Sequence, residues 1–315
     1  MNISVVAPPA IGPEDRRLWS AAMRSEGIAS PFLSWAFVDV IGQVRDDAWV
    51  AVVEGDEGPG YFAFQRGPDG SGAPIGAGIC DAQAFIAPPP WDFRPQQLFS
   101  ACGLEAWSFD HMVVEQAPFE PFHRERHRVP VVELASGYQA FDKRIRSHSK
   151  DFLPQVLRRR RKLEREIGPM EFEWSTSGVE EAMMVLQEWK SNQYHRTGVW
   201  DRFGHPWIVG ALNRFAHTRD PDCTGLLSVL RAGEVPVAVH LGLMSRDRLC
   251  WWFPAYDPAF ARYSPGLILI LELISAAADR GVPLLDLGRG EHDYKLRIAD
   301  RFYEVAEGEW SAGRV

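Results

Sequence analysis

The sequence has few of the features that would assign it to a specialised class of protein. No apolar stretch reaches the ~20 residues of a membrane span, because the longest, residues 267–278, is interrupted by Glu272. The N-terminus lacks the basic region and sustained apolar run of a signal peptide. Only four cysteines occur in 315 residues, without the paired spacing of a disulfide framework or zinc motif: Cys80, Cys102, Cys223 and Cys250. We therefore expect a cytoplasmic protein without a membrane span.

Acidic residues outnumber basic ones, and the chain has a net charge of −8. Residues 143–165 are the exception, with ten Lys or Arg against two acidic residues, which leaves −16 on the rest of the chain. Nucleic-acid binding requires a broad basic surface. The acidic remainder therefore argues against a DNA partner, and the basic segment is left to attract one anionic ligand.

Apolar periodicity and turn residues indicate alternating helices and strands, and no internal sequence repeat is visible. In the first third, we expect helices at residues 13–25, 34–44 and 95–102 and strands at 49–53, 60–64, 105–109 and 128–134. Further helices are expected at 149–167 and 179–195.

The most informative residues lie between 224 and 295. Strand-like runs at 225–231, 235–244 and 248–256 precede Arg262-Tyr-Ser-Pro-Gly266, which opens a long apolar helix. A strand-to-helix turn exposes backbone N–H groups that bind anions such as pyrophosphate. Pro265 removes an N–H that the first helical turn would leave unpaired, and Gly266 permits close approach of a ligand. The pattern predicts a phosphate site.

A further strand from Pro283 ends in a glycine turn, and the order of all these elements resembles GNAT-type acyltransferases, most closely the CelD-like or FemAB-like branch. The resemblance rests on Tyr263-Ser-Pro-Gly266, Asp286-Leu-Gly-Arg-Gly290 and Tyr294-Lys295. Ser149-Lys-Asp-Phe152, the basic run 158–165 and Trp189-Lys-Ser-Asn-Gln-Tyr-His-Arg-Thr-Gly198 also resemble that branch. The likeness begins at Lys143; earlier in the chain it rests mainly on Pro31-Phe-Leu-Ser34.

The resemblance implies an α/β (α+β) fold of tandem GNAT-like domains, each a mixed, mostly antiparallel sheet flanked by helices. A degenerate domain would occupy residues 1–140, and the acyltransferase domain residues 141–315. The co-substrate would be acetyl-CoA or another acyl-CoA, held by Arg262, Tyr263, Ser264, Pro265, Gly266 and Leu267.

In a GNAT-type reaction an amine attacks the thioester directly, without a covalent enzyme intermediate. Such a site needs positioning, a neutral amine, a polarising N–H and a proton source for the thiolate. The strand at 248–256 would supply the N–H. Pro254 has no N–H to donate, so it would splay the end of this strand and open the sheet for the pantetheine arm; the alternative is an ordinary edge-strand proline. Tyr256 would protonate the thiolate or contact substrate; the alternative is a half-buried tyrosine.

Three further residues are catalytic candidates. Asp286 ends an apolar strand and would be a general base of raised pKa if buried, or would bond the glycine turn that follows. In the FemAB-like branch a lysine near the position of Lys295 lies close to donor or acceptor; the alternative is a solvated helix lysine. His240, within a central strand, is a base or a hydrogen-bonded core histidine.

Acceptor-binding candidates come from two segments. Lys190 and Tyr194 lie one turn apart on the helix at 179–195, and Arg289 and Tyr294 follow the strand that ends at Asp286. The alternative for the first pair is that both flank a buried tryptophan. His123 and His127 are four residues apart, but a strand follows and no third ligand is close in sequence, so we expect no metal.

These residues predict an acyl-CoA-dependent N-acyltransferase acting on a small-molecule amine, such as an amino sugar or an amino-acid derivative. One alternative is a FemAB-like transferase that takes aminoacyl-tRNA, against which the acidic body and the lack of a long helical arm stand. Another is a non-catalytic CoA-binding or scaffold protein, because a fold alone does not establish an activity.

Overall fold

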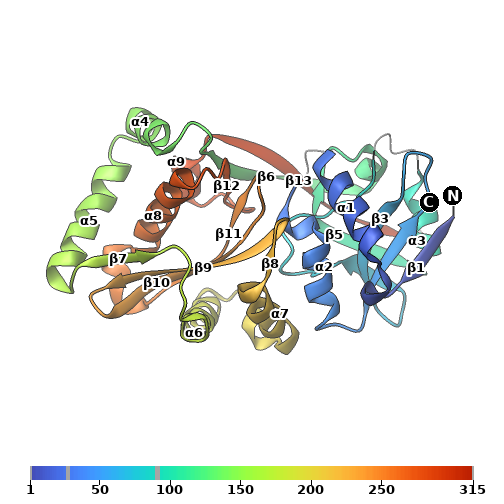
Figure 1. Ribbon diagram of the computed structural model, residues 1–315, viewed down its shortest axis with the longest axis horizontal. Coiled ribbons are helices and arrows are strands. Elements are labelled where there is room, and N and C mark those ends of the chain that lie inside the picture. The colour runs from blue at the N-terminus through green and yellow to red at the C-terminus, as the bar shows by residue number, and fades with distance from the viewer. Residues whose placement is uncertain (1, 26–28, 89–92, 314–315) are drawn as a thin grey trace. The chain divides into compact units, whose positions relative to one another are not determined.

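The computed structural model describes residues 2–25, 29–88 and 93–313. These residues form two compact units (Figure 1). Unit 1 comprises residues up to Val129, Asp220–Cys223 and the segment from Tyr303 onward, and unit 2 comprises Pro130–Arg219 and Thr224–Phe302. Both are mixed α/β structures with a mostly antiparallel sheet flanked by helices, which confirms the predicted fold class.

Unit 1 is built on the strand order β1-β2-β3-β4-β5-β13. Its aromatic core includes the fully buried Phe62, Phe99 and Phe119, from β3, α3 and the segment before β6. The strands are β1 Ile3–Val6, β2 Ala48–Val53, β3 Gly60–Arg66, β4 Ser71–Pro74, β5 Ala106–Val113 and β13 Arg301–Ser311, and the helices are α1 Pro13–Ser25, α2 Trp35–Gly42 and α3 Pro95–Ala101.

Unit 2 has the strand order β7-β9-β10-β11-β12-β6, and the short β8 (Arg219–Asp220) pairs with β9. The strands are β6 His123–Glu133, β7 Met170–Glu173, β9 Cys223–Ala232, β10 Val235–Met244, β11 Leu249–Tyr256 and β12 Leu284–Asp286. The helices are α4 Tyr138–His148, α5 Phe152–Glu166, α6 Val179–Thr197, α7 Pro206–His217, α8 Pro265–Asp279 and α9 Asp293–Ile298.

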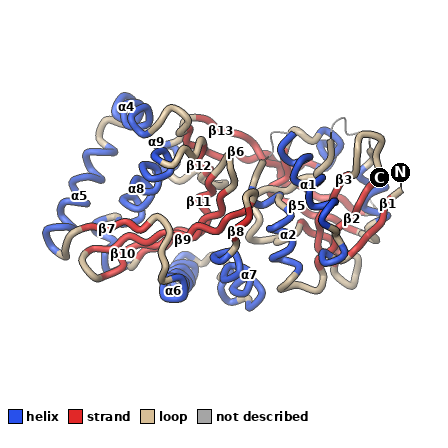
Figure 2. The backbone as a smooth tube through the Cα atoms, viewed as in Figure 1, coloured by secondary structure: helices blue, strands red, loops and turns tan. Residues whose placement is uncertain are grey.

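Helices cover both faces of the unit 2 sheet. Helix α8 is apolar almost all round and packs on β10 and β11, with α4 and α5 packed against it. Helix α6 packs on the same two strands from the opposite face, where α7 also lies (Figures 1 and 2). The buried stripe of α5 includes Leu153, Val156 and Leu163, which recur at helical spacing, and Pro154 occupies the first turn, where its missing N–H is harmless.

The two units repeat one topology that the sequence does not reveal. In each, two helices separate the first and second strands of the sheet, and one helix separates the fourth and fifth. The fourth and fifth strands are parallel in both units, and the other neighbours are antiparallel. The sixth strands are exchanged: β6 follows β5 along the chain but pairs with β12, whereas β13 follows β12 but pairs with β5.

This exchange explains how the units differ from the predicted domains, 1–140 and 141–315. Unit 2 begins about ten residues earlier because Val131, Val132 and Glu133 pair with β12. The last strand belongs to unit 1 because Val305–Ser311 pairs with β5. Among the described residues, no helix is long and apolar enough to cross a membrane.

Candidate active site

A gap between two parallel strands lies at the centre of unit 2. Strands β11 and β12 pair at only two positions, Leu249 with Leu285 and Cys250 with Asp286. Strand β12 then ends, while β11 continues to Tyr256 along β10. The strand therefore separates from its neighbour before Pro254, which sits within the continuing ladder opposite His240.

A cavity of about 440 Å³ adjoins this gap. Seven of the predicted site residues line it: Lys190, Tyr256, Ser264, Gly266, Leu267, Tyr294 and Lys295. The other lining residues are Gln193, Trp251, Trp252, Pro254, Ala255, Ala261 and His292. The cavity therefore joins the N-terminus of α8, the end of β11, helix α6 and helix α9.

The N-terminus of α8 has the properties of an anion site. Ser264, the N-cap residue, has φ = 53°, the only positive φ of a non-glycine residue in the described chain, and its side chain does not cap the helix. Its Oγ instead accepts a hydrogen bond of 2.7 Å from Arg159 of α5. Gly266 faces open space, since an added Cβ would meet only Tyr256, at 3.6 Å. The positive end of the α8 dipole and a guanidinium thus lie at one end of the cavity.

Three residues of the predicted phosphate loop lie outside the lining of the cavity. Tyr263 is fully buried, and its hydroxyl donates to Glu166 over 2.6 Å, so it anchors the loop to α5. Arg262 donates to the Tyr263 hydroxyl over 2.5 Å, and its side chain is largely exposed. Pro265 begins α8 and is buried in it. None of the three lines the cavity.

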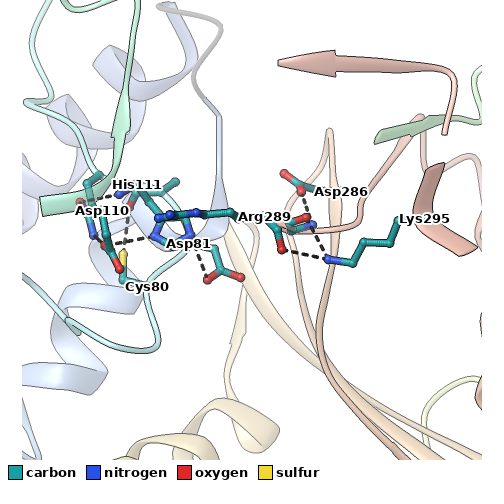
Figure 3. A network of polar contacts seen from close by, with 10 residues as sticks. Cys80, Asp81, Asp110, His111, Asp286, Arg289 and Lys295 are labelled. Carbon is teal, nitrogen blue, oxygen red and sulfur yellow. Dashed lines mark hydrogen bonds and ion pairs between the residues drawn. The ribbon is translucent and has the colours of Figure 1, made fainter. Parts of the chain in front are cut away.

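Two buried lysines face the cavity. Lys190 is 9% exposed and donates to the Pro254 carbonyl over 3.0 Å and to Gln193 Oε1 over 3.2 Å. Burial lowers the pKa of Lys190 to about 8, with smaller contributions from Arg202 and Lys295. Lys295 is 7% exposed, and its Nζ donates to the carbonyls of Gly288 and Arg289 over 3.0 and 3.1 Å (Figure 3).

Two tyrosines supply hydroxyl groups. Tyr256 ends β11 and is 37% exposed, and it lines the cavity as predicted. The Tyr294 hydroxyl accepts a hydrogen bond of 3.1 Å from the Trp251 indole. Burial raises the pKa of Tyr294, so it remains protonated at neutral pH.

Asp286 and His240 lie outside the lining of the cavity. Asp286 accepts hydrogen bonds from Arg248 over 3.1 Å and from the Gly288 N–H over 2.9 Å, which matches the alternative of a carboxylate that fixes the glycine turn. His240 is completely buried and stacks on Trp251, and its Nε2 accepts from the Trp252 N–H over 3.3 Å. Burial lowers the pKa of His240 to about 3, which is typical of a neutral core histidine.

Two acceptor-binding candidates are also outside the lining. Tyr194 is buried and stacks on Phe203, and its ring lies 5.4 Å from Lys190 Nζ. The backbone carbonyl of Arg289 accepts a hydrogen bond from Lys295 Nζ. Among the residues that sequence reasoning missed, Gln193 follows Lys190 by three positions on α6, so helical spacing alone could have found it.

Three residues of unit 1 have the spacing of metal ligands, and one of them, His127, belongs to the rejected histidine pair. Glu125, His127 and Glu307 have ligand atoms within 4.8 Å of one another. Sequence reasoning missed the group because Glu307 comes from β13, far along the chain. Its members are exposed or half-buried, and His127 Nε2 lies 3.2 Å from Glu307 as in an ordinary ion pair.

Comparison with known proteins finds a family model that matches part of unit 2. Residues 150–296 match the model of the acetyltransferase (GNAT) domain. FemX has a similar structure, with a TM-score of 0.60, 10% identity and coverage of 98% of this chain and 96% of that chain. A tandem GNAT protein from the clavulanic acid biosynthesis pathway covers 100% of both chains, with a TM-score of 0.54 and 9% identity.

A third similar structure is fungal. The chain resembles the GCN5-related glucosamine N-acetyltransferase region of a multi-domain β-N-acetylglucosaminidase, with a TM-score of 0.52 and 11% identity, over 98% of this chain and 38% of that one. At these identities the likenesses establish the fold, and they confirm the tandem GNAT-like architecture. A search of curated proteins finds no match to the chain.

Proposed function

Residues 150–296 match the model of the acetyltransferase (GNAT) domain, and from this premise we propose that the protein is an acyl-CoA-dependent N-acyltransferase. The acyl group, acetyl by default, passes from the CoA thioester to the amine of a small molecule, such as an amino sugar or amino-acid derivative. The amine attacks the thioester directly, so no side chain has to carry the acyl group.

The cavity at the gap between β11 and β12 is the observation that carries this proposal. β12 does not cover β11 beyond Cys250, so an extended pantetheine arm has backbone groups to pair with there. The pyrophosphate then lies at the N-terminus of α8, against Gly266 and beside Arg159. The thioester lies deeper, between Trp252 and Tyr256.

The side chains in the cavity divide the remaining chemistry. Tyr256 donates a proton to the departing thiolate, and Lys295 stabilises negative charge that develops on the thioester oxygen. Asp and Glu are absent from the described lining, so proton removal from the amine falls to His292 or to solvent at the cavity mouth.

Isothermal titration with acetyl-CoA, longer acyl-CoAs and free CoA tests the donor. We expect saturable binding that Gly266→Leu abolishes, because the added side chain would occupy the cavity where a Cβ alone fits. Gly313→Ala is the control, since nothing lies within 4 Å of its added Cβ. Thiol release with a panel of amines then tests transfer. Failure of every CoA species to bind would contradict the proposal.

The second candidate, aminoacyl-tRNA as donor, is favoured by one surface. Arg158, Arg161 and Arg165 are exposed on α5, beside the helix turn that carries Arg159. A polyanion could bind there. Binding of tRNA, lost when the three arginines are replaced by Gln, together with no affinity for CoA, would select this donor; CoA binding without turnover of any amine would select the non-catalytic alternative.

A further inference from the structure

Lys190 is a buried cation for which the described residues supply no counter-ion. Its ammonium group has three N–H donors, and two of them are used on neutral oxygens, the Pro254 carbonyl and Gln193 Oε1. Within the described residues, no carboxylate lies within ion-pair distance of it. A buried charge is normally paired, because removing it from water is costly. Lys190 lines the cavity, so its third N–H can be donated to a ligand there.

The rest of the cavity is also short of negative charge. Its described lining contains two lysines and no acidic side chain, and the charged groups that lower the pKa of Lys190 are Arg202 and Lys295, both cationic. The interior therefore favours an anion and disfavours a second cation.

Lys190 and the predicted phosphate loop reach the cavity from helices on opposite faces of the sheet. It comes from α6, which packs on one face of β10 and β11, whereas Gly266 and Ser264 begin α8, which packs on the other face (Figure 1). The anion that Lys190 binds is thus separate from the CoA pyrophosphate. We therefore assign the anionic group that Lys190 binds to the acceptor.

We propose that the acceptor amine carries a carboxylate or phosphate group and that Lys190 binds this group. The inference rests on the proposed N-acyltransferase function and specifies its substrate class. An amino acid or a phosphorylated amino sugar fits, and a polyamine does not.

The same charges assist the reaction. A protonated amine next to Lys190 and Lys295 is disfavoured relative to the neutral amine, because like charges lower its pKa. The anionic group of the acceptor offsets the repulsion on binding, and the neutral amine is the form that attacks a thioester. This accounts for a cavity without a lining carboxylate as general base.

The test compares matched ligands that differ by the anionic group. Glucosamine 6-phosphate is titrated against glucosamine, and L-serine against L-serinamide, with and without saturating acetyl-CoA. We expect the anionic member of one pair to bind about tenfold tighter or better, and Lys190→Met to remove that preference. Lys190→Arg should retain part of it. Lys143→Met, which removes an exposed lysine elsewhere in unit 2, should change nothing.

Several results would overturn the inference. The neutral member of each pair could bind as tightly as the anionic one, neither anionic ligand could bind, or Lys190→Met could leave the preference intact. Displacement of the anionic ligand by acetyl-CoA would assign Lys190 to the donor. CoA binding is measured in a separate titration. If an anion binds in a Lys190-dependent manner but no CoA species binds, the proposed donor is refuted and the anion site at Lys190 is supported.

Discussion

Replacing Lys190 with Met should stabilise the ligand-free protein at neutral pH. The folded protein holds the pKa of Lys190 at about 8 against an ordinary value of 10.5. At 1.36 kcal/mol for each pH unit, the charged form costs about 3 kcal/mol in the folded state. The variant also loses two hydrogen bonds to neutral oxygens, each contributing about 1 kcal/mol. The net gain expected for Lys190→Met is about 1 kcal/mol.

The pH dependence separates this mechanism from a general packing effect. Below pH 8, Lys190 is charged in both the folded and the unfolded state, so the full cost is present. Between pH 8 and 10.5 the folded protein has released the proton and the unfolded chain still holds it, so the stability of the wild type rises with pH. Lys190→Met lacks this rise, and its advantage of about 1 kcal/mol should therefore shrink and then reverse in that range.

Urea unfolding of both proteins at pH 6, 7, 8, 9 and 10 measures the difference, and other titrating groups cancel in the comparison. Lys143→Met serves as the control because its lysine is exposed. A variant that is less stable than wild type by the same amount at pH 6 and pH 10 would refute the reasoning. It would mean that Lys190 stabilises the fold by its contacts and is not held in the charged form at a cost.

Three further predictions concern single positions. Ser264→Gly should be more stable than Ser264→Ala by about 1 kcal/mol in thermal unfolding, because both lose the side-chain hydrogen bond but only glycine relieves the positive φ; equal stability would contradict this. Gly225→Ala should yield little folded protein by circular dichroism, since its Cβ would lie 1.7 Å from the Phe215 carbonyl oxygen, whereas Gly313→Ala should fold normally. Tyr256→Phe should lower kcat about tenfold or more while the Kd for acetyl-CoA stays unchanged; an unchanged kcat would exclude Tyr256 as the proton donor.

Most regular elements of the fold could be predicted from local patterns. The helix expected at residues 13–25 has those bounds, and the expected helix at 179–195 runs to Thr197. Helices α4 and α7 were not predicted. In both, buried residues such as Phe141 and Phe215 are mixed with polar ones in segments that carry no strong start signal beyond Pro206.

The candidate site was harder to predict because it depends on pairing between distant strands. The turn at Ser264–Gly266 was predicted from its own residues, whereas Lys295 was predicted from the resemblance to the FemAB-like branch. Whether a side chain reaches the cavity depends on where β12 stops beside β11, which no local pattern encodes. For that reason Asp286, at the end of β12, could be expected at the site although its carboxylate is bound to Arg248 and the glycine turn.

The exchanged strands have a consequence for synthesis of the protein on the ribosome. Strand β5 of unit 1 lacks its neighbour until residues 305–311 have been translated, after the whole of unit 2. Unit 2, in contrast, already has β6 when β12 emerges. The later part of the chain therefore completes its sheet first, and the nascent N-terminal part waits with an open edge. A truncation before residue 301 would leave that edge permanently available to other chains.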